Sequence, residues 1–161
     1  MATRKHSILI ASRNEGWRLR RTLDSIVEHA SEAPPEVVVV DDASDDDSVV
    51  FLSELSESDY RGAPVQLERN AERRGLIYSR ARAAELASGE LLTFLDAHCA
   101  VSPGWLSGLA EELDAMDQRG IVTPLVHYLD AETWSFSPTS PAIDAASIVN
   151  PLLDFGWAEP R

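Results

Sequence analysis

The sequence predicts an α/β fold in which an open, mostly parallel sheet carries helices on both faces. Apolar runs that suit buried strands alternate with segments whose apolar residues recur at helical spacing. The alternation occurs five times, and no internal repeat or low-complexity tract interrupts it. The chain has 161 residues, of which 44% are hydrophobic and 25% charged, a balance typical of a soluble globular protein with one core.

Five short strands are expected. The clearest is EVVVVDD, which is β-branched nearly throughout and is therefore expected to be buried on both faces. The first, SILIAS, is a continuous apolar run, and the third follows the turn residues Gly62-Ala63-Pro64. The expected strands span residues 7–12, 36–42, 65–68, 90–96 and 121–126.

Four helices are expected in the connections between these strands. The third is rich in alanine, runs from about Leu76 to Ala87 and ends at Ser88-Gly89. The fourth has an apolar side with leucines at helical spacing. The expected start signals are Asn14 for the first helix, Ser44 or Asp45 for the second, short helix, and Pro103 for the fourth.

Composition excludes several classes of function. The 27 acidic and 14 basic residues give a net charge of −13, which argues against nucleic acid as a partner. No apolar run approaches the roughly 18 residues that a membrane span needs. The start of the chain, MATRKHSILIAS, lacks the length and cleavage pattern of a signal peptide, so a cytoplasmic location is expected. The single cysteine, Cys99, excludes an internal disulfide.

Residues that could carry chemistry follow the expected strands. Ligands bind at the carboxyl ends of open parallel sheets, and two acidic clusters lie there: Asp41-Asp42, and Asp96 with His98. Asp96 and His98 alternate on an extended segment, so both side chains can hold one ion. Carboxylate, imidazole and arginine at one edge suit a metal-bound diphosphate. The arginines expected at this edge are Arg69, Arg73, Arg74 and Arg80.

Each of these features also has a purely structural explanation. Acidic residues at strand ends often cap the next turn, and the ASDDDS segment suits a solvated helix start. An arginine-rich loop is commonly only surface. His6, His29 and His127 are assigned to structure. The residues taken singly therefore leave binding and structural roles open.

The order of the segments is more specific than any one of them. Three segments in this order resemble those of the GT-A glycosyltransferases. They are RNE after the first strand, VVVVDDAS, and RRGLIYSRARAAELASGELLTFLDAHCAVSPGWL at residues 73–106. The chain is most similar to glycosyltransferase family two and the related polypeptide N-acetylgalactosaminyltransferases, over roughly residues 7–127. The resemblance implies the Rossmann-like GT-A fold of nucleotide-diphospho-sugar transferases.

The resemblance also implies a donor site. The acid of the VDDAS segment would contact the uridine of a UDP-sugar, and two arginines would line the site. Asp96 and His98 would hold a divalent ion, Mn²⁺ or Mg²⁺, on the diphosphate. The implied donor-binding residues are Ala11, Asn14, Glu15, Asp41, Asp42, Arg73, Gly75, Arg80, Asp96 and Ala97.

The chain departs from the family pattern in two ways. It has Ala11-Ser12-Arg13-Asn14-Glu15 where the N-acetylgalactosaminyltransferases have Thr-Phe-His-Asn-Glu, so the base pocket need not be the same. No motif of the family's acceptor-binding half is found, including its distal metal-binding histidine and its carboxylate base. We therefore expect a nucleotide-sugar-binding domain at 1–130 and the irregular start of an acceptor-side region at 131–161, with no nameable catalytic base.

Alternatives from other classes are a binding module or pseudoenzyme that needs a partner chain, and a phosphoacceptor domain. VVVVDDAS resembles the acidic pair of a response-regulator receiver, but such domains need a lysine after a late strand and the only lysine is Lys5. No Gly-x-Gly-x-x-Gly follows the first strand, which excludes a nicotinamide-binding domain. Trp134, Phe155 and Trp157 are expected to form exposed apolar surface that favours association. This predicts a homo-oligomer or a partner subunit. The acceptor is unknown.

Overall fold

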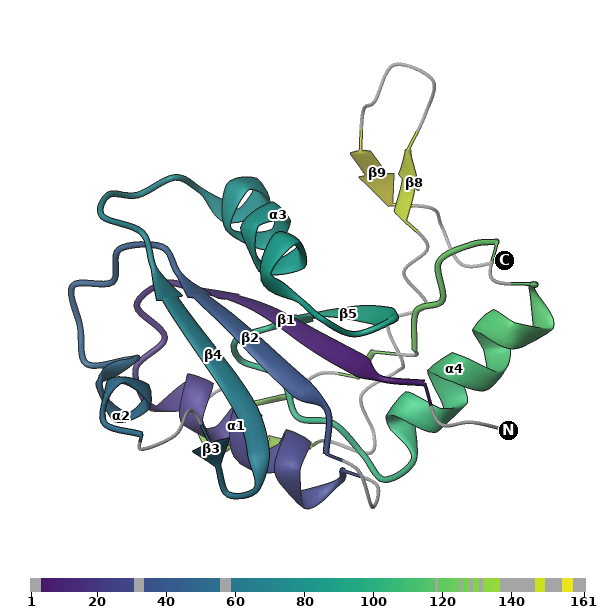
Figure 1. Cartoon of the computed structure of the whole chain (residues 1–161), viewed down its shortest axis with the longest axis horizontal. Coiled ribbons are helices and arrows are strands. Elements are labelled where there is room, and N and C mark those ends of the chain that lie inside the picture. Colours follow the sequence, from purple (N-terminus) through teal and green to yellow (C-terminus); the bar gives the residue numbers. More distant parts are fainter. Residues whose placement is uncertain are drawn as a thin grey trace. The chain divides into compact units, whose positions relative to one another are not determined.

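A five-stranded sheet is the framework of the first of two compact units, Met1–Ala110 and Glu111–Arg161, in the computed structural model of the chain (Figure 1). Each unit is treated by itself. None of the described helices is long and apolar enough to cross a membrane. The structure describes residues 4–30, 34–55, 59–117, 119–124, 126–127, 129–130, 132–136 and, for the backbone only, 147–149 and 155–157.

The sheet has the strand order β3-β4-β2-β1-β5. Its four longer strands are parallel to one another, and β3 pairs antiparallel with β4 at one edge. The register sets Ala11 of β1 between Val40 of β2 and Asp96 of β5. The strands are β1 (His6–Ser12), β2 (Glu36–Asp41), β3 (Asp59–Tyr60), β4 (Ala63–Arg69) and β5 (Leu91–Asp96).

Helices cover both faces of this sheet (Figure 1). On one face α3 packs on β1 and β2, with Ala83 against Leu9, Val38 and Val40. The other face carries the larger core, in which α1 and α2 pack against β1 and β2. The helices among the described residues are α1 (Trp17–Glu28), α2 (Val50–Ser53), α3 (Leu76–Leu86) and α4 (Trp105–Ala115).

The edge strand β5 is less buried than the central strand β2. All four valines of β2 are fully buried, as expected for a strand covered on both faces. Burial alternates along the edge strand β5 instead, and Leu92 and Phe94 are about half exposed. They lie on the same face of the sheet as α3, which covers the central strands but not these two side chains. β5 therefore has an exposed, partly apolar side along its length, and this side ends at Asp96.

Four of the five expected strands are confirmed, and the expected strand at 121–126 is wrong. The described residues 121–124 are irregular, and Val126 forms only an isolated bridge. Pro124 lacks the N–H that a strand inside a ladder donates, and Ile121 is 89% exposed instead of buried. The fifth strand of the sheet is the two-residue β3, which precedes the turn at Gly62.

The described residues of the second unit include the end of α4 and several short strands. The strands form two antiparallel pairs. Trp134 is half-buried, whereas the side chains of Phe155 and Trp157 lie outside the described residues, so self-association stays a prediction. The expected boundary near residue 130 stays a prediction as well. The pairs are β6 (Leu129–Asp130) with β7 (Ser135–Phe136), and β8 (Ser147–Val149) with β9 (Phe155–Trp157).

The expected caps of α1 and α2 are wrong, although the expected helices exist. α1 begins after Gly16, and no side chain caps it, so Asn14 is not its cap. α2 begins after Val49, well beyond Ser44 and Asp45, again without a side-chain cap. The polar residues of both loops are used instead in hydrogen bonds that join the two loops, as described below.

Gly89 gives a test of the close approach between β1 and the turn that leads into β5. A Cβ on Gly89 would lie 2.5 Å from Ser7 Oγ and 2.7 Å from Ser7 N. Because backbone atoms must move, Gly89→Ala is expected to lower the free energy of unfolding by about 2 kcal/mol in urea denaturation. The control is Gly108→Ala in α4, where a Cβ meets nothing within 4 Å. It is expected to stabilise by about 0.5–1 kcal/mol, and equal effects of the two changes would contradict this packing.

Candidate functional site

The loops after β1 and β2 are joined along their length by hydrogen bonds. The Asn14 N–H donates to Ser44 Oγ (2.9 Å), and Asn14 Oδ1 accepts from the Asp45 N–H (3.0 Å). Gly16 N–H donates to Ser48 Oγ at 2.7 Å. These bonds span about 30 residues, which is why local capping rules did not find them. The polar residues at the carboxyl ends of β1 and β2 thus fix one another.

Arg13 closes this junction. Its Nη1 donates to the backbone oxygens of Asp42 (2.7 Å) and Ala43 (2.6 Å). Ala43 has a φ of 56°, a left-handed conformation that a residue with a Cβ adopts at a cost. Two charge-assisted hydrogen bonds offset part of that cost. Arg13 belongs to the RNE segment and to the stretch that departs from the family pattern, and the sequence did not predict this structural role.

Asp41 is fully buried and its carboxylate is occupied by the protein itself. Arg69 Nε donates to Oδ2 at 2.7 Å, and the Ser44 hydroxyl donates to Oδ1. Arg69 Nη2 also donates to the Ser44 carbonyl at 2.9 Å. In this structure Asp41 therefore pairs β2 with the end of β4.

Asp42 is 5% exposed and ties the end of β2 to the start of α3. Oδ1 accepts from Asn70 Nδ2 (2.8 Å) and from the Arg74 N–H (2.7 Å), and Oδ2 accepts from the Gly75 N–H (2.8 Å). Gly75 has a φ of 90°, a conformation that favours glycine. Burial raises the pKa of Asp42, but the surrounding hydrogen-bond donors outweigh burial and hold it below its usual value.

Asp96 ends β5 with its side chain 51% exposed. Arg80 of α3, 37% exposed, donates from Nη2 to Asp96 Oδ1 at 2.5 Å. Asp96 is the residue that the register sets beside Ala11 of β1. The structure thus brings together three of the expected donor-site residues: Ala11, Arg80 and Asp96.

His98 lies against Glu15 of the loop after β1. Its Nδ1 is 3.2 Å from both carboxylate oxygens, with His98 52% and Glu15 19% exposed. The segment between Asp96 and Cys99 is held from α1: Thr22 Oγ1 donates to the carbonyl of the buried Ala97 (3.0 Å) and accepts from the Cys99 N–H (3.1 Å). Thr22 was not foreseen, because its partners lie more than 70 residues away.

No set of three or more His, Cys, Asp or Glu side chains in the described part of the chain is arranged to hold a metal ion. Each of the two expected ligands has a protein partner instead, Arg80 for Asp96 and Glu15 for His98. The expectation that the two grip one ion therefore stays a prediction.

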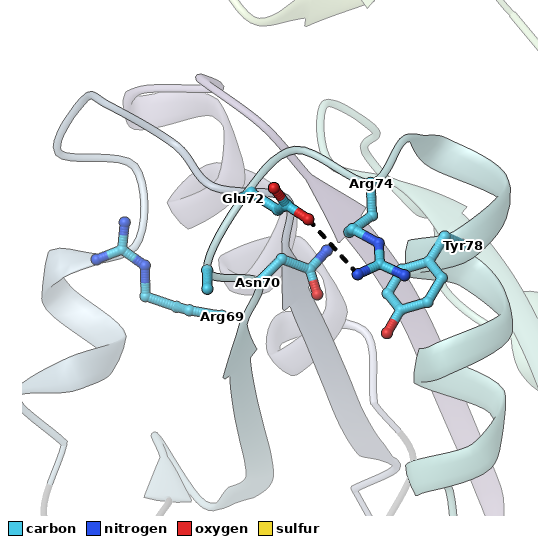
Figure 2. A pocket seen from close by; sticks show the side chains of 6 residues that line it. Arg69, Asn70, Glu72, Arg74 and Tyr78 are labelled. Atoms are coloured by element: carbon cyan, nitrogen blue, oxygen red, sulfur yellow. Dashed lines mark ion pairs between the residues drawn. The ribbon is translucent and has the colours of Figure 1, made fainter.

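A cavity of about 350 Å³ opens on the loop between β4 and α3 (Figure 2). Arg74 lies over the Tyr78 ring, 4.4 Å from its centroid, and 3.8 Å from the Glu72 carboxylate. Arg73 does not line it; Arg73 is exposed and makes no hydrogen bond or ion pair with the described residues. The lining residues are Arg69, Asn70, Ala71, Glu72, Arg74 and Tyr78.

Asp42→Asn tests the tie between β2 and α3. At pH 7 the change is expected to lower the free energy of unfolding by about 2 kcal/mol, because an amide group would face buried N–H donors. The pKa of Asp42 is lower in the folded protein than in the unfolded chain, where it is about 3.9. The ionised carboxylate therefore stabilises the folded state above about pH 3.9, and this stabilisation is lost as pH falls through the folded pKa. The difference between wild type and variant should therefore shrink below about pH 4.

Urea denaturation at several pH values between 3 and 7 measures this difference. Asp47→Asn is the control, since Asp47 is exposed and its side chain has no hydrogen-bond partner among the described residues. A loss in Asp42→Asn that stays constant with pH would contradict a role for the carboxylate charge.

Comparison with known proteins identifies the family. Residues 7–153 match the model of "Glycosyl transferase family 2". Polypeptide N-acetylgalactosaminyltransferase 5 of Caenorhabditis elegans is 33% identical over an alignment of 163 residues. The alignment covers 94% of this chain and 24% of the relative. Polypeptide N-acetylgalactosaminyltransferase 3 of Taeniopygia guttata is 38% identical over 157 residues, covering 94% of this chain and 25% of the relative. The chain thus spans about a quarter of the length of these relatives.

Solved structures agree with this assignment. The crystal structure of GalNAc-T7 with UDP, GalNAc and Mn²⁺ superposes with a TM-score of 0.62 at 31% identity, over 70% of this chain and 21% of that one. The mannosyltransferase PcManGT from Pyrobaculum calidifontis, in complex with GDP-Man and Mn²⁺, has a TM-score of 0.62 at 25% identity, over 78% of this chain and 35% of that one. This chain belongs to glycosyl transferase family 2, and its sheet has the GT-A fold.

Proposed function

We propose that this chain binds the donor of a metal-dependent glycosyl transfer, a nucleotide diphosphate sugar of the UDP type. The observation that carries the proposal is the pair of half-exposed side chains, Asp96 and His98, at the carboxyl end of β5, with Arg80 beside the carboxylate. It combines a carboxylate, an imidazole and a guanidinium where an α/β sheet receives its ligand.

The choice of donor rests on the relatives. GalNAc-T7 was crystallised with UDP and Mn²⁺, and the mannosyltransferase with GDP-Man and Mn²⁺, so both bind a nucleoside diphosphate with the same ion. The higher identity to GalNAc-T7, 31% against 25%, favours UDP for this chain.

The residues present fit a divalent ion. Carboxylate oxygen and imidazole nitrogen are suitable ligands for Mn²⁺. His98 makes its contact with Glu15 through Nδ1, and Nε2 has no hydrogen-bond partner among the described residues. Asp96 and His98 would hold the ion, which would stabilise the charge of the leaving diphosphate as a Lewis acid. Mg²⁺ is the alternative ion.

The chain's own residues have distinct proposed tasks. Arg80 and Arg73 would supply positive charge for the diphosphate. Asp42 mainly fixes the start of α3 through the N–H groups of Arg74 and Gly75, and it would contact the base from that position. Asn14 and Glu15 would form the wall after β1, with Ala11 below them.

A second candidate is a nucleotide-sugar-binding module that does not turn over. It is favoured because, within the described ranges, no group of three or more His, Cys, Asp or Glu side chains is arranged to hold a metal ion. Both candidates require the same donor site, so one binding experiment tests the site for either.

Calorimetric titration of UDP with and without MnCl₂ tests the proposal. Wild type is expected to bind UDP at least about tenfold more tightly with Mn²⁺, equivalent to about 1.4 kcal/mol. Asp96→Ala should lose most of that gain because the ion loses a charged ligand. The control is Glu90→Ala, which removes an exposed carboxylate next to the amino end of β5. If UDP fails to bind under either condition, or if Asp96→Ala keeps the full Mn²⁺ effect, the proposed donor site is wrong.

A further inference from the structure

Two arginines of α3 reach the sheet and are paired in different ways. Arg82 donates from Nε and Nη2 to both carboxylate oxygens of Glu68 on β4, at 2.6 and 3.0 Å, and from Nη1 to Glu85 at 2.9 Å. Arg80 makes a single contact, from Nη2 to Asp96 Oδ1. Arg82 is thus held at three points, whereas Arg80 can leave its partner by breaking one ion pair.

The Arg80–Asp96 pair is poorly suited to a structural role. Its two side chains are 37% and 51% exposed, and ion pairs so exposed contribute little to stability because water screens them. Neither side chain has a second hydrogen-bond partner among the described residues. The pair nevertheless neutralises Asp96, the carboxylate that the proposed cation would need.

We propose that Arg80 is an exchangeable partner of Asp96 that makes metal and nucleotide bind cooperatively. In the absence of ligand the guanidinium neutralises Asp96; in the complex the cation takes the carboxylate and Arg80 pairs with the diphosphate. The inference rests on the proposed function, which names the two ligands but not their coupling. Arg80 is in this respect a positioning residue that acts through Asp96 as well as a contact for the diphosphate.

The coupling follows from the charges. A divalent cation that arrives alone must displace Arg80 from Asp96 or lie beside its positive charge. A diphosphate that arrives alone meets the negative charge of Asp96 and an arginine that is already neutralised. When both arrive, carboxylate pairs with cation and guanidinium with phosphate, so every charge has a partner. Each ligand therefore removes the obstacle to the other, and the coupling must be equal in both directions.

Removing the guanidinium separates the two effects. In Arg80→Gln the carboxylate of Asp96 is free, so Mn²⁺ alone is expected to bind about threefold or more tightly than it binds wild type. UDP loses a cationic partner, so the coupling factor between Mn²⁺ and UDP is expected to fall from about tenfold or more to below about threefold. Arg80→Lys keeps the positive charge and should keep most of the coupling.

The experiment measures the affinity for MnCl₂ alone by electron paramagnetic resonance of free Mn²⁺, and for UDP with and without MnCl₂ by calorimetry. Arg82→Gln is the matched control, because it removes one positive charge from the same helix but one that pairs with Glu68 and Glu85. It should leave both the Mn²⁺ affinity and the coupling at their wild-type values. Thermal unfolding of each variant shows whether it is folded.

The outcomes separate this inference from the proposed function. If Arg80→Gln binds Mn²⁺ alone no more tightly than wild type, or keeps the full coupling, the exchange is wrong even where wild type binds UDP with Mn²⁺. A purely structural ion pair would lower the unfolding temperature of Arg80→Gln and leave the coupling unchanged, which also overturns the exchange. If no variant binds UDP, the proposed function fails, and the nucleotide half of the exchange fails with it.

Discussion

The carboxylate of Asp42 is the constraint on which the rest of the site depends. It accepts two backbone N–H groups from the residues that start α3, and a third hydrogen bond from Asn70. The same residue donates its N–H to the Ser12 carbonyl, and its own carbonyl accepts from Arg13. The ends of β1, β2 and β4 and the start of α3 therefore meet at one residue. The position of α3 in turn decides which strands its arginines reach.

The acidic residues at this edge divide into two kinds. Asp41 and Asp42 are buried and satisfied by protein donors, so their charge is used to hold loops together. Asp96 and Glu15 are paired more loosely, each with one basic or titratable side chain, and Asp96 is half exposed. The buried charges, which protein groups neutralise, thus hold the loops in place, and the charges near solvent are the ones that the proposed donor site would use.

The hydrophobic pattern predicted the parallel sheet and the helices between its strands because burial on both faces leaves a strong apolar signal, as in β2. It failed at 121–126, where Pro124 interrupts the apolar run and Ile121 is exposed, and it missed β3, which has only two residues. Rules for strand ends directed attention to Asp41, Asp42 and Asp96, and the structure places all three at the carboxyl ends of β2 and β5. They could not show which of these carboxylates pair with other groups of the protein. The partners Arg69, Asn70 and Arg80 lie 16 to 28 residues away in the sequence. Arg13 and Thr22 were missed for the same reason.

The pairing of β5 with β1 has a consequence for how the protein folds. His6 pairs with Leu91 and His98 meets Glu15 across 83 residues, whereas β1 and β2 pair over a much shorter loop. Contacts that close long loops form late, because the chain loses much conformational freedom before they repay it. We infer that β5 is among the last strands to dock. The proposed donor site would then be complete only when the whole sheet has formed. During synthesis, the nascent chain would form this site only after β5 has left the ribosome.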